Sequence, residues 1–254
     1  MEIINKWTMY EKLIKSRHID IFLPETALIT KPEIVFDMLY CYKSVFIKPC
    51  VGYGGNYIIH IFKIKRDLFK FYYYTKENIY TKTISYIELE TLILKQIYCR
   101  QCIVQRDVKL AKYKGAYTNI RVRVEKHIEK SWKCTRILGK VATKELTITS
   151  IDFGATVVSY DKLSFSCSID KSLVQLELYD LSIHVVKHLS KIHDYSCTCV
   201  WGLDLAIDHC GGIWFIDACL YDNITVKPGN FKERCIITLD QSINFLAELR
   251  RLLK

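Results

Sequence analysis

Two apolar runs in the C-terminal part of the chain predict a β-hairpin. The runs are WGLDLAID and GIWFIDA, with a turn at residues 209–212 between them, and the hairpin covers about residues 200–223. Asp204 lies inside the first run, and Asp217 lies near the end of the second. A carboxylate among apolar strand residues is costly unless it is paired or binds a cation. If both side chains fall on one face of the hairpin, they converge on one metal ion.

Helical spacing of apolar residues marks several other segments. It predicts helices over residues 6–15, up to about 42, over 87–97, over 173–192 and over 240–253. Pro32, within a capping box of Thr30 and Glu33, sets the start of the second helix. The apolar positions of the fourth helix are residues 173, 176, 183, 186 and 189. Its His184 and His188 suit packing or the surface better than a metal site.

The stretch SVFIKPCVGYGGNYIIHIFKI predicts a strand, a glycine loop and a second strand. Lys48 ends the first strand, and the loop contains Gly52, Gly54 and Gly55. Such a loop offers backbone N–H groups to a phosphate, and the lysine adds a positive charge. The stretch is not a P-loop, because no GK[ST] follows and the next element is a strand. A phosphate-binding loop and a plain glycine-rich hairpin both remain open.

Alternating patterns predict further strands, two of which carry basic residues. The predicted strands are FKFYYY, CIVQ, TNIRVRVEKH, SWKCTRILGKVA and residues 147–152. Alternation places Arg121 and Arg123 on one face with Asn119 and Glu125. Neighbouring basic strands of this kind are compatible with a phosphate-binding wall, although a solvated sheet face is the simpler interpretation. The tyrosines of FKFYYY likewise suit a sheet better than a platform for stacked bases.

Composition narrows the classes of partner. The chain has 254 residues and a formal net charge of +10, which favours an anionic partner, but the lysines are scattered and argue against nucleic acid. No apolar run is long enough to span a membrane, and residues 1–10 lack a signal-peptide core, so we expect a cytoplasmic protein. The 11 cysteines are expected to be reduced. Those at 197, 199 and 210, with nearby histidines 193 and 209, do not match a standard zinc spacing.

Taken in order, four segments resemble the ATP-grasp superfamily, and most closely its YheC/YheD-like, endospore coat-associated branch. The segments are FLPET, VFIKPCVGYGGNYI, IVQRDVKLAKYKGAYTNIRVRVEK, and WGLDLAID with GIWFIDA. The resemblance covers nearly the whole chain. It implies an α+β ATP-grasp fold, in which two α+β lobes with antiparallel sheets grip a nucleotide between them. The implied divisions are a short N-terminal extension at 1–30, an N-terminal lobe at 31–104 and a C-terminal lobe at 105–254.

The resemblance also implies roles for individual residues, with ATP and Mg²⁺ as the cofactors. Lys48 would reach the phosphates, Gly52, Gly54 and Gly55 would cover them, and Gln105 to Val108 would form the hinge that holds adenine. Arg121 and Lys140 would stabilise the transferring phosphoryl group. Asp204 and Asp217 would hold magnesium.

The sequence departs from the family pattern at four positions. The last strand reads Asp217-Ala218-Cys219 in place of Glu-x-Asn, and a thiol is a poor ligand for magnesium. Asn119 stands where an aspartate is usual, and Lys140 stands for an arginine. Asp222 or Asn223 would be a substitute oxygen ligand.

Three activities follow from the resemblance. The first is an ATP-dependent carboxylate–amine ligase that forms an acyl-phosphate on a peptide or amino-acid substrate, and the basic balance suits an acidic one. The alternatives are a degenerate, non-catalytic nucleotide-binding or assembly protein, and an ATP-grasp kinase.

Overall fold

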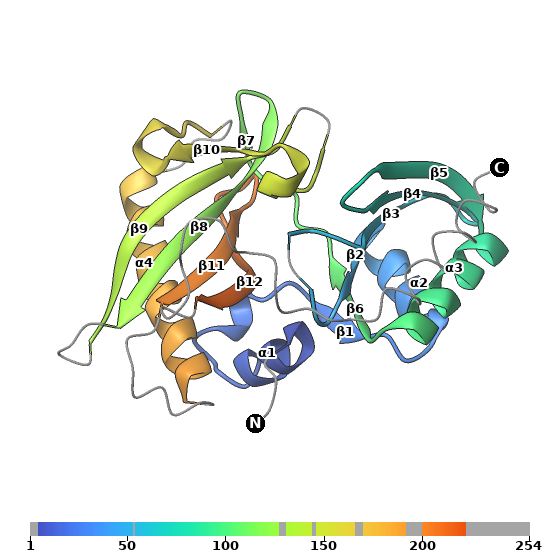
Figure 1. The fold of residues 1–254 in the computed structure, drawn as a ribbon, viewed down its shortest axis with the longest axis horizontal. Coiled ribbons are helices and arrows are strands. Elements are labelled where there is room, and N and C mark those ends of the chain that lie inside the picture. The colour runs from blue at the N-terminus through green and yellow to red at the C-terminus, as the bar shows by residue number, and fades with distance from the viewer. Residues whose placement is uncertain are drawn as a thin grey trace.

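The computed structural model describes residues 5–52, 54–126, 131–143, 146–165, 170–191 and 200–221. These residues form two antiparallel sheets that lie side by side, each with helices on one face (Figure 1). The α+β architecture with two antiparallel sheets, predicted from the sequence, is confirmed. None of the helices in these ranges is both long and apolar enough to cross a membrane.

The first lobe is a six-stranded sheet in the order β1-β6-β2-β3-β4-β5. Its strands are β1 (Thr26–Leu28), β2 (Ser44–Pro49), β3 (Ile58–Lys65), β4 (Leu68–Tyr74), β5 (Ile79–Ser85) and β6 (Cys102–Arg106). Helices α2 (Pro32–Tyr42) and α3 (Tyr86–Cys99) supply apolar residues to the core of this lobe. Alternation along β2 sends Val45 and Ile47 into that core. Lys48 therefore points to the opposite face of the sheet.

The second lobe carries the predicted hairpin in a sheet of order β10-β9-β8-β11-β12, with β7 paired to β8. Its strands are β7 (Lys112–Tyr113), β8 (Ala116–Lys126), β9 (Trp132–Val141), β10 (Thr156–Ser159), β11 (Val200–Ile207) and β12 (Ile213–Tyr221). Helices α1 (Lys6–Leu13) and α4 (Lys171–Ser190) contribute to the core on one face of this sheet. Short 3-10 helices cover Asp20–Phe22, Ile151–Phe153 and Tyr160–Lys162. The other face of the sheet is left for polar residues.

Two local predictions were wrong. Residues 147–152 are not a strand, and only a 3-10 turn begins there, at Ile151. The N-cap of α2 is Lys31, without a side-chain hydrogen bond, so the proposed capping box does not form. The box occurs instead at α3, where Ser85 and Glu88 cap each other. Residues 85–88 read Ser-Tyr-Ile-Glu, which is the S-x-x-E pattern of such a box.

The buried face of α4 also differs from the predicted one. Leu173 and Leu176 are 64% and 63% exposed. Val186 and Leu189 are buried as predicted, and Ile183 packs against the core, but the other buried apolar residues of the helix are Val174, Leu178, Leu181 and Val185. The exposed positions 173 and 176 and the buried positions 174, 178, 181 and 185 are both spaced as on one face of a helix. The sheet against which the helix packs decides which of the two faces is buried. The predicted helix over 240–253 and the cysteines at 197 and 199 lie outside the described residues.

The lobes divide somewhat differently from the predicted boundaries. The boundary expected at residue 105 falls inside β6, which pairs with β1 and β2 in the first sheet. The expected N-terminal extension is split between the lobes. Met9 and Leu13 of α1 belong to the core of the second lobe, whereas β1 is a strand of the first.

Candidate functional site

The hairpin places its two aspartates opposite each other. Asp204 of β11 pairs directly with Asp217 of β12, and on its other side with Arg121 of β8. Residues directly opposite in neighbouring strands point to the same face, with Cβ atoms about 5 Å apart. A β-bulge follows this pair, because Leu205 is opposite Phe215 and Ile216 is left unpaired. The bulge keeps the apolar alternation of both strands while both carboxylates remain on the polar face.

Two basic side chains converge on Asp204. Lys140 Nζ lies 2.8 Å and Arg121 Nε lies 3.1 Å from the same carboxylate oxygen, Oδ1. Lys140 comes from β9, where it pairs with Asn119 of β8. The Oδ1 atom is buried and accepts no well-aligned hydrogen bond from the residues the structure describes. These two cations already compensate the buried charge, so a metal ion would have to displace at least one of them to bind this oxygen.

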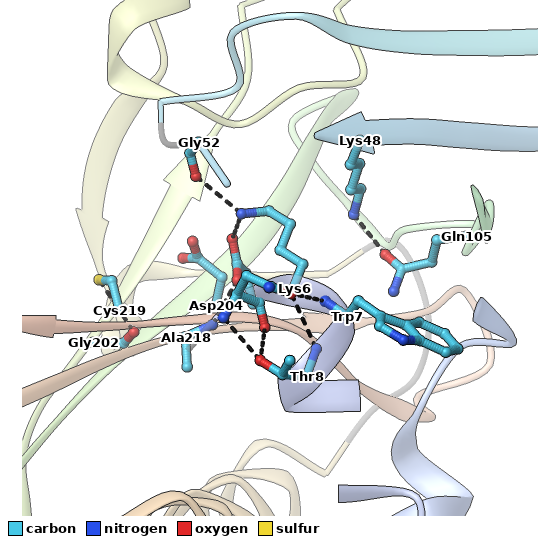
Figure 2. Close-up of polar contacts among 12 residues, drawn as sticks. Lys6, Trp7, Thr8, Lys48, Gly52, Gln105, Gly202, Asp204, Ala218 and Cys219 are labelled. Atoms are coloured by element: carbon cyan, nitrogen blue, oxygen red, sulfur yellow. Dashed lines mark hydrogen bonds and ion pairs between the residues drawn. The ribbon is translucent and has the colours of Figure 1, made fainter. Parts of the chain in front are cut away.

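Asp217 is held by a residue that sequence reasoning missed, Lys6. The Lys6 Nζ lies 2.9 Å from Asp217 Oδ2 and donates to the carbonyl oxygen of Gly52 at 3.0 Å. Figure 2 shows this side chain reaching across the site to the glycine loop. Lys6 is the first residue of α1, and Asn5 caps that helix in a reciprocal box with Thr8. The Asn-x-x-Thr spacing indicated a helix start in the sequence, but nothing local indicated that Lys6 meets Asp217.

Lys48 lies on the first sheet and is buried, with 8% of its surface exposed. Its ammonium donates to Gln105 Oε1 at 2.5 Å (Figure 2), and Gln105 Nε2 donates to Thr26 Oγ1 at 2.9 Å. Burial lowers the pKa of Lys48 to about 8, against which Asp217 acts as the largest opposing charge. A desolvated lysine held by one neutral acceptor is poised to gain an anionic partner.

The glycine loop adopts a conformation that requires glycine at two positions. Gly54 and Gly55 have φ angles of +70° and +78°. A Cβ atom at Gly54 would lie 2.1 Å from Asp152 Oδ2, and one at Gly55 would lie 3.0 Å from Ile148. Both contacts are made by the segment around the 3-10 turn of the second lobe. The loop is therefore in close contact with both lobes.

A buried histidine, which sequence reasoning also missed, connects the lobes behind this loop. The side chain of His60 on β3 has Nε2 3.0 Å from Asp107 Oδ2 and Nδ1 2.9 Å from Thr147 Oγ1. Tyr74 OH lies 3.1 Å from the same Thr147 oxygen. The His60 ring also stacks on Phe46 at 3.8 Å between centroids. Burial lowers the pKa of His60, which favours the neutral ring.

Cys219 lies beside the carboxylate pair without replacing an oxygen ligand. Arg121 Nη1 donates to its Sγ at 3.1 Å. The thiol donates to the carbonyl oxygen of Gly202 at 3.4 Å, as Figure 2 shows. The nearby Asn119 is buried, and its Oδ1 has no hydrogen-bond partner among the described residues. Asp222 and Asn223, the substitutes considered above, lie outside the described residues. The described oxygen donors are thus Asp204 and Asp217.

The structure places the predicted site residues on the facing surfaces of the two lobes. Lys48, the glycine loop and Gln105 come from the first lobe, and the second contributes the set Arg121, Lys140, Asp204 and Asp217. Val108 follows β6 in the segment between the lobes and is buried. The two carboxylates, Asp204 and Asp217, are thus surrounded by four basic side chains, which leaves an excess of positive charge. These side chains are Lys6, Lys48, Arg121 and Lys140. Such a site can bind a polyanion together with a cation.

Comparison with known proteins gives the following similarities. A family model described as "YheC/D like ATP-grasp" matches residues 1–234. Endospore coat-associated protein YheD of Bacillus subtilis (strain 168) is 25% identical over 224 residues, which are 84% of this chain and 47% of that protein. Endospore coat-associated protein YheC of the same organism is 23% identical over 226 residues, which are 89% and 60%. This chain thus spans about half the length of the curated relatives it matches.

One solved structure similar to this chain is the C-terminal domain of K. lactis Pby1, an ATP-grasp enzyme interacting with the mRNA decapping enzyme Dcp2. It is 14% identical, with a TM-score of 0.49, and the match covers 96% of this chain and 68% of that one.

Proposed function

The chain belongs to the YheC/D-like ATP-grasp family, and on that premise we propose that it is an ATP-dependent carboxylate–amine ligase. The observation that carries the proposal is the convergence of Lys140 and Arg121 on Asp204, directly opposite Asp217. Lys48 and Lys6 face this cluster, with Lys6 bound to Asp217. Cations on both sides of a carboxylate pair suit a nucleotide triphosphate bound with a metal ion.

The two carboxylates of the site, those of Asp204 and Asp217, supply the oxygen ligands that magnesium prefers. Magnesium takes oxygen ligands and is usually held by one or two carboxylates plus phosphate oxygens. Asp204 and Asp217 would hold it once the ion displaces cationic side chains that now contact their oxygens, which are Lys140 and Arg121 at Asp204 and Lys6 at Asp217. When bound, the ion would neutralise charge on the phosphates and keep them in line for transfer. Cys219, as a thiol, does not join this set.

The lysines and the hinge would bind and orient the nucleotide. Lys48 would exchange its contact with Gln105 for a phosphate oxygen, and the freed amide would be available to the adenine ring. Lys6 would move from Asp217 to the phosphates once a stronger cation takes its place. The backbone N–H groups of the glycine loop would cover the phosphates from the first lobe.

Arg121 and Lys140 would stabilise the charge that develops when the γ-phosphoryl group moves to a carboxylate of the substrate. The resulting acyl-phosphate is attacked by an amine, which forms an amide and releases phosphate. Positioning and electrostatics account for such a step, so no serine or cysteine nucleophile is required.

A second candidate is a nucleotide-binding protein without turnover. Cys219 favours it, because the thiol contacts Arg121 at the position where an oxygen ligand is usual. Cys219→Asn separates the two functions, since it supplies an amide oxygen beside Asp217. A ligase would gain activity or magnesium affinity in this variant, whereas a binding protein would remain inactive.

The test is ADP formation from ATP and magnesium with pools of amino acids and peptides, followed by product analysis. An amide product supports the ligase, and a stable phosphorylated product indicates a kinase. ADP formation should be lost in Lys48→Met and kept in Lys65→Met, which changes an exposed lysine of the same lobe. ATP binding without ADP formation from any pool, in the wild type and in Cys219→Asn, would contradict the ligase.

A further inference from the structure

An arginine pair lies one row away from the carboxylate cluster on the second sheet. Arg123 of β8 is directly opposite Arg136 of β9, and both side chains are exposed. Arg123 lies two residues along β8 from Arg121 and therefore shares its face of the sheet. On its other side Arg123 pairs with Gly202, which has no side chain. The pair thus borders the proposed reaction centre on the open face.

The fold gains nothing evident from this pair. Like charges directly opposite each other in a sheet are destabilising. Arg123 Nε is compensated by Glu125 Oε1 at 2.5 Å. Arg136 has no hydrogen-bond or ion-pair partner among the described residues, and the neighbouring Lys133 is exposed as well. The charge of Arg136, which the fold leaves uncompensated opposite another arginine, therefore indicates a binding role.

The distance from the reaction centre limits what can bind. Strands rise about 3.4 Å per residue, so the Arg123 row lies about 7 Å from the row of Arg121 and Asp204. That separation suits a small molecule or side chain with two anionic groups. Arginine presents a planar fork of donors that matches a carboxylate, and Arg123 keeps donors beyond the one used by Glu125.

We propose that Arg123 and Arg136 bind a second carboxylate of the acceptor, which is the substrate whose first carboxylate receives the phosphoryl group. The ligase would then act on a dicarboxylate such as a glutamyl peptide. This inference rests on the proposed function, because Arg121 and Asp204 define where the first carboxylate reacts. The carboxylates of Glu125, Asp204 and Asp217 are each paired with basic side chains, so Arg136 offers one local site for an anion and not a continuous basic track. A short acidic peptide fits that arrangement better than nucleic acid does.

Binding of tetraglutamate to the full chain, measured calorimetrically with ADP and magnesium present, tests the site. Tetraglutamine is the neutral counterpart, and hexathymidylate is the phosphate-bearing polyanion. The variants are Arg136→Ala and Arg136→Glu. Arg66→Ala, in the exposed turn between β3 and β4, is the matched control. Thermal unfolding checks that each variant is folded, and ADP affinity is measured separately.

We expect tetraglutamate to bind and tetraglutamine not to bind. Arg136→Ala should weaken peptide binding about tenfold, as loss of a charge-assisted hydrogen bond does. Arg136→Glu should abolish it, and Arg66→Ala should leave it unchanged. ADP affinity should stay the same in all variants, because Arg136 lies outside the nucleotide cluster.

Equal binding of tetraglutamate by the wild type and Arg136→Glu would overturn the proposal, as would equal binding of the two peptides. Tighter, Arg136-dependent binding of hexathymidylate would also overturn it and would assign the site to phosphate. If ADP binds but tetraglutamate does not, the acceptor site is refuted while the nucleotide function stands. If tetraglutamate binds in an Arg136-dependent way but no nucleotide does, the site stands and the proposed function fails.

Discussion

Lys48→Met tests whether Lys48 is a desolvated cation that awaits an anionic ligand. Burial lowers the pKa of Lys48 from 10.5 to about 8, which corresponds to a destabilisation of about 3 kcal/mol when the lysine is charged at neutral pH. Methionine removes that cost but leaves Gln105 Oε1 without its donor, which costs about 1–3 kcal/mol. The two effects nearly offset each other at neutral pH. The pH dependence of stability therefore separates them better than its absolute value.

The direction in which stability changes with pH depends on whether the folded or the unfolded chain holds the Lys48 proton. Between about pH 8 and pH 10.5 the unfolded chain holds the Lys48 proton while the folded chain has released it, so the wild type becomes more stable as the pH rises. From about pH 7 to about pH 9.5 the wild type should gain about 2 kcal/mol relative to Lys48→Met. Below about pH 7 the difference should be constant.

Urea denaturation of wild type, Lys48→Met and Lys65→Met across this range measures the effect. Lys65 is an exposed lysine at the end of β3, so its variant should follow the wild type at every pH. Parallel curves for the wild type and Lys48→Met would refute the assignment of a lowered pKa to Lys48. ADP should stabilise the wild type and should have no effect on Lys48→Met.

Three further predictions concern the loop, the lobe contact and the core. Gly54→Ala should weaken nucleotide binding, because alanine is strained at φ +70° in the loop and its Cβ would displace the Asp152 carboxylate, which lies 2.1 Å away. Gly115→Ala, with φ +83° and no atom within 4 Å of the added Cβ, should show backbone strain alone and leave nucleotide binding unchanged. Calorimetry measures the binding, and thermal unfolding measures the strain. Thr147→Val should lower the free energy of unfolding by about 1–3 kcal/mol in urea titrations, since the buried His60 loses one of its two partners, and no change would refute that contact. Leu178→Ala should cost about 2–5 kcal/mol and Leu173→Ala almost nothing; equal costs would contradict the observed orientation of α4.

Much of the fold was predictable because its signals are local. The hairpin follows from two apolar runs and a glycine turn. The presence of α2 and α3 follows from the helical spacing of their apolar residues. The ATP-grasp resemblance, confirmed by the family match, rests on the order of four short segments. The predicted strand at 147–152 failed because Ile148 lies against Gly55 of the glycine loop and Ile151 is exposed, so neither pairs in a sheet.

The sequence alone determined the chemistry available to this protein. It supplied carboxylates within apolar strands, a lysine before a glycine loop and alternating basic strands, since periodicity fixes which residues share a face. Only the tertiary structure decided which of these groups meet. Lys6 reaches Asp217 from the far end of the chain, and Lys140 and Arg121 share one oxygen of Asp204. Such contacts depend on the register between strands and on how the lobes pack, and no local pattern encodes either.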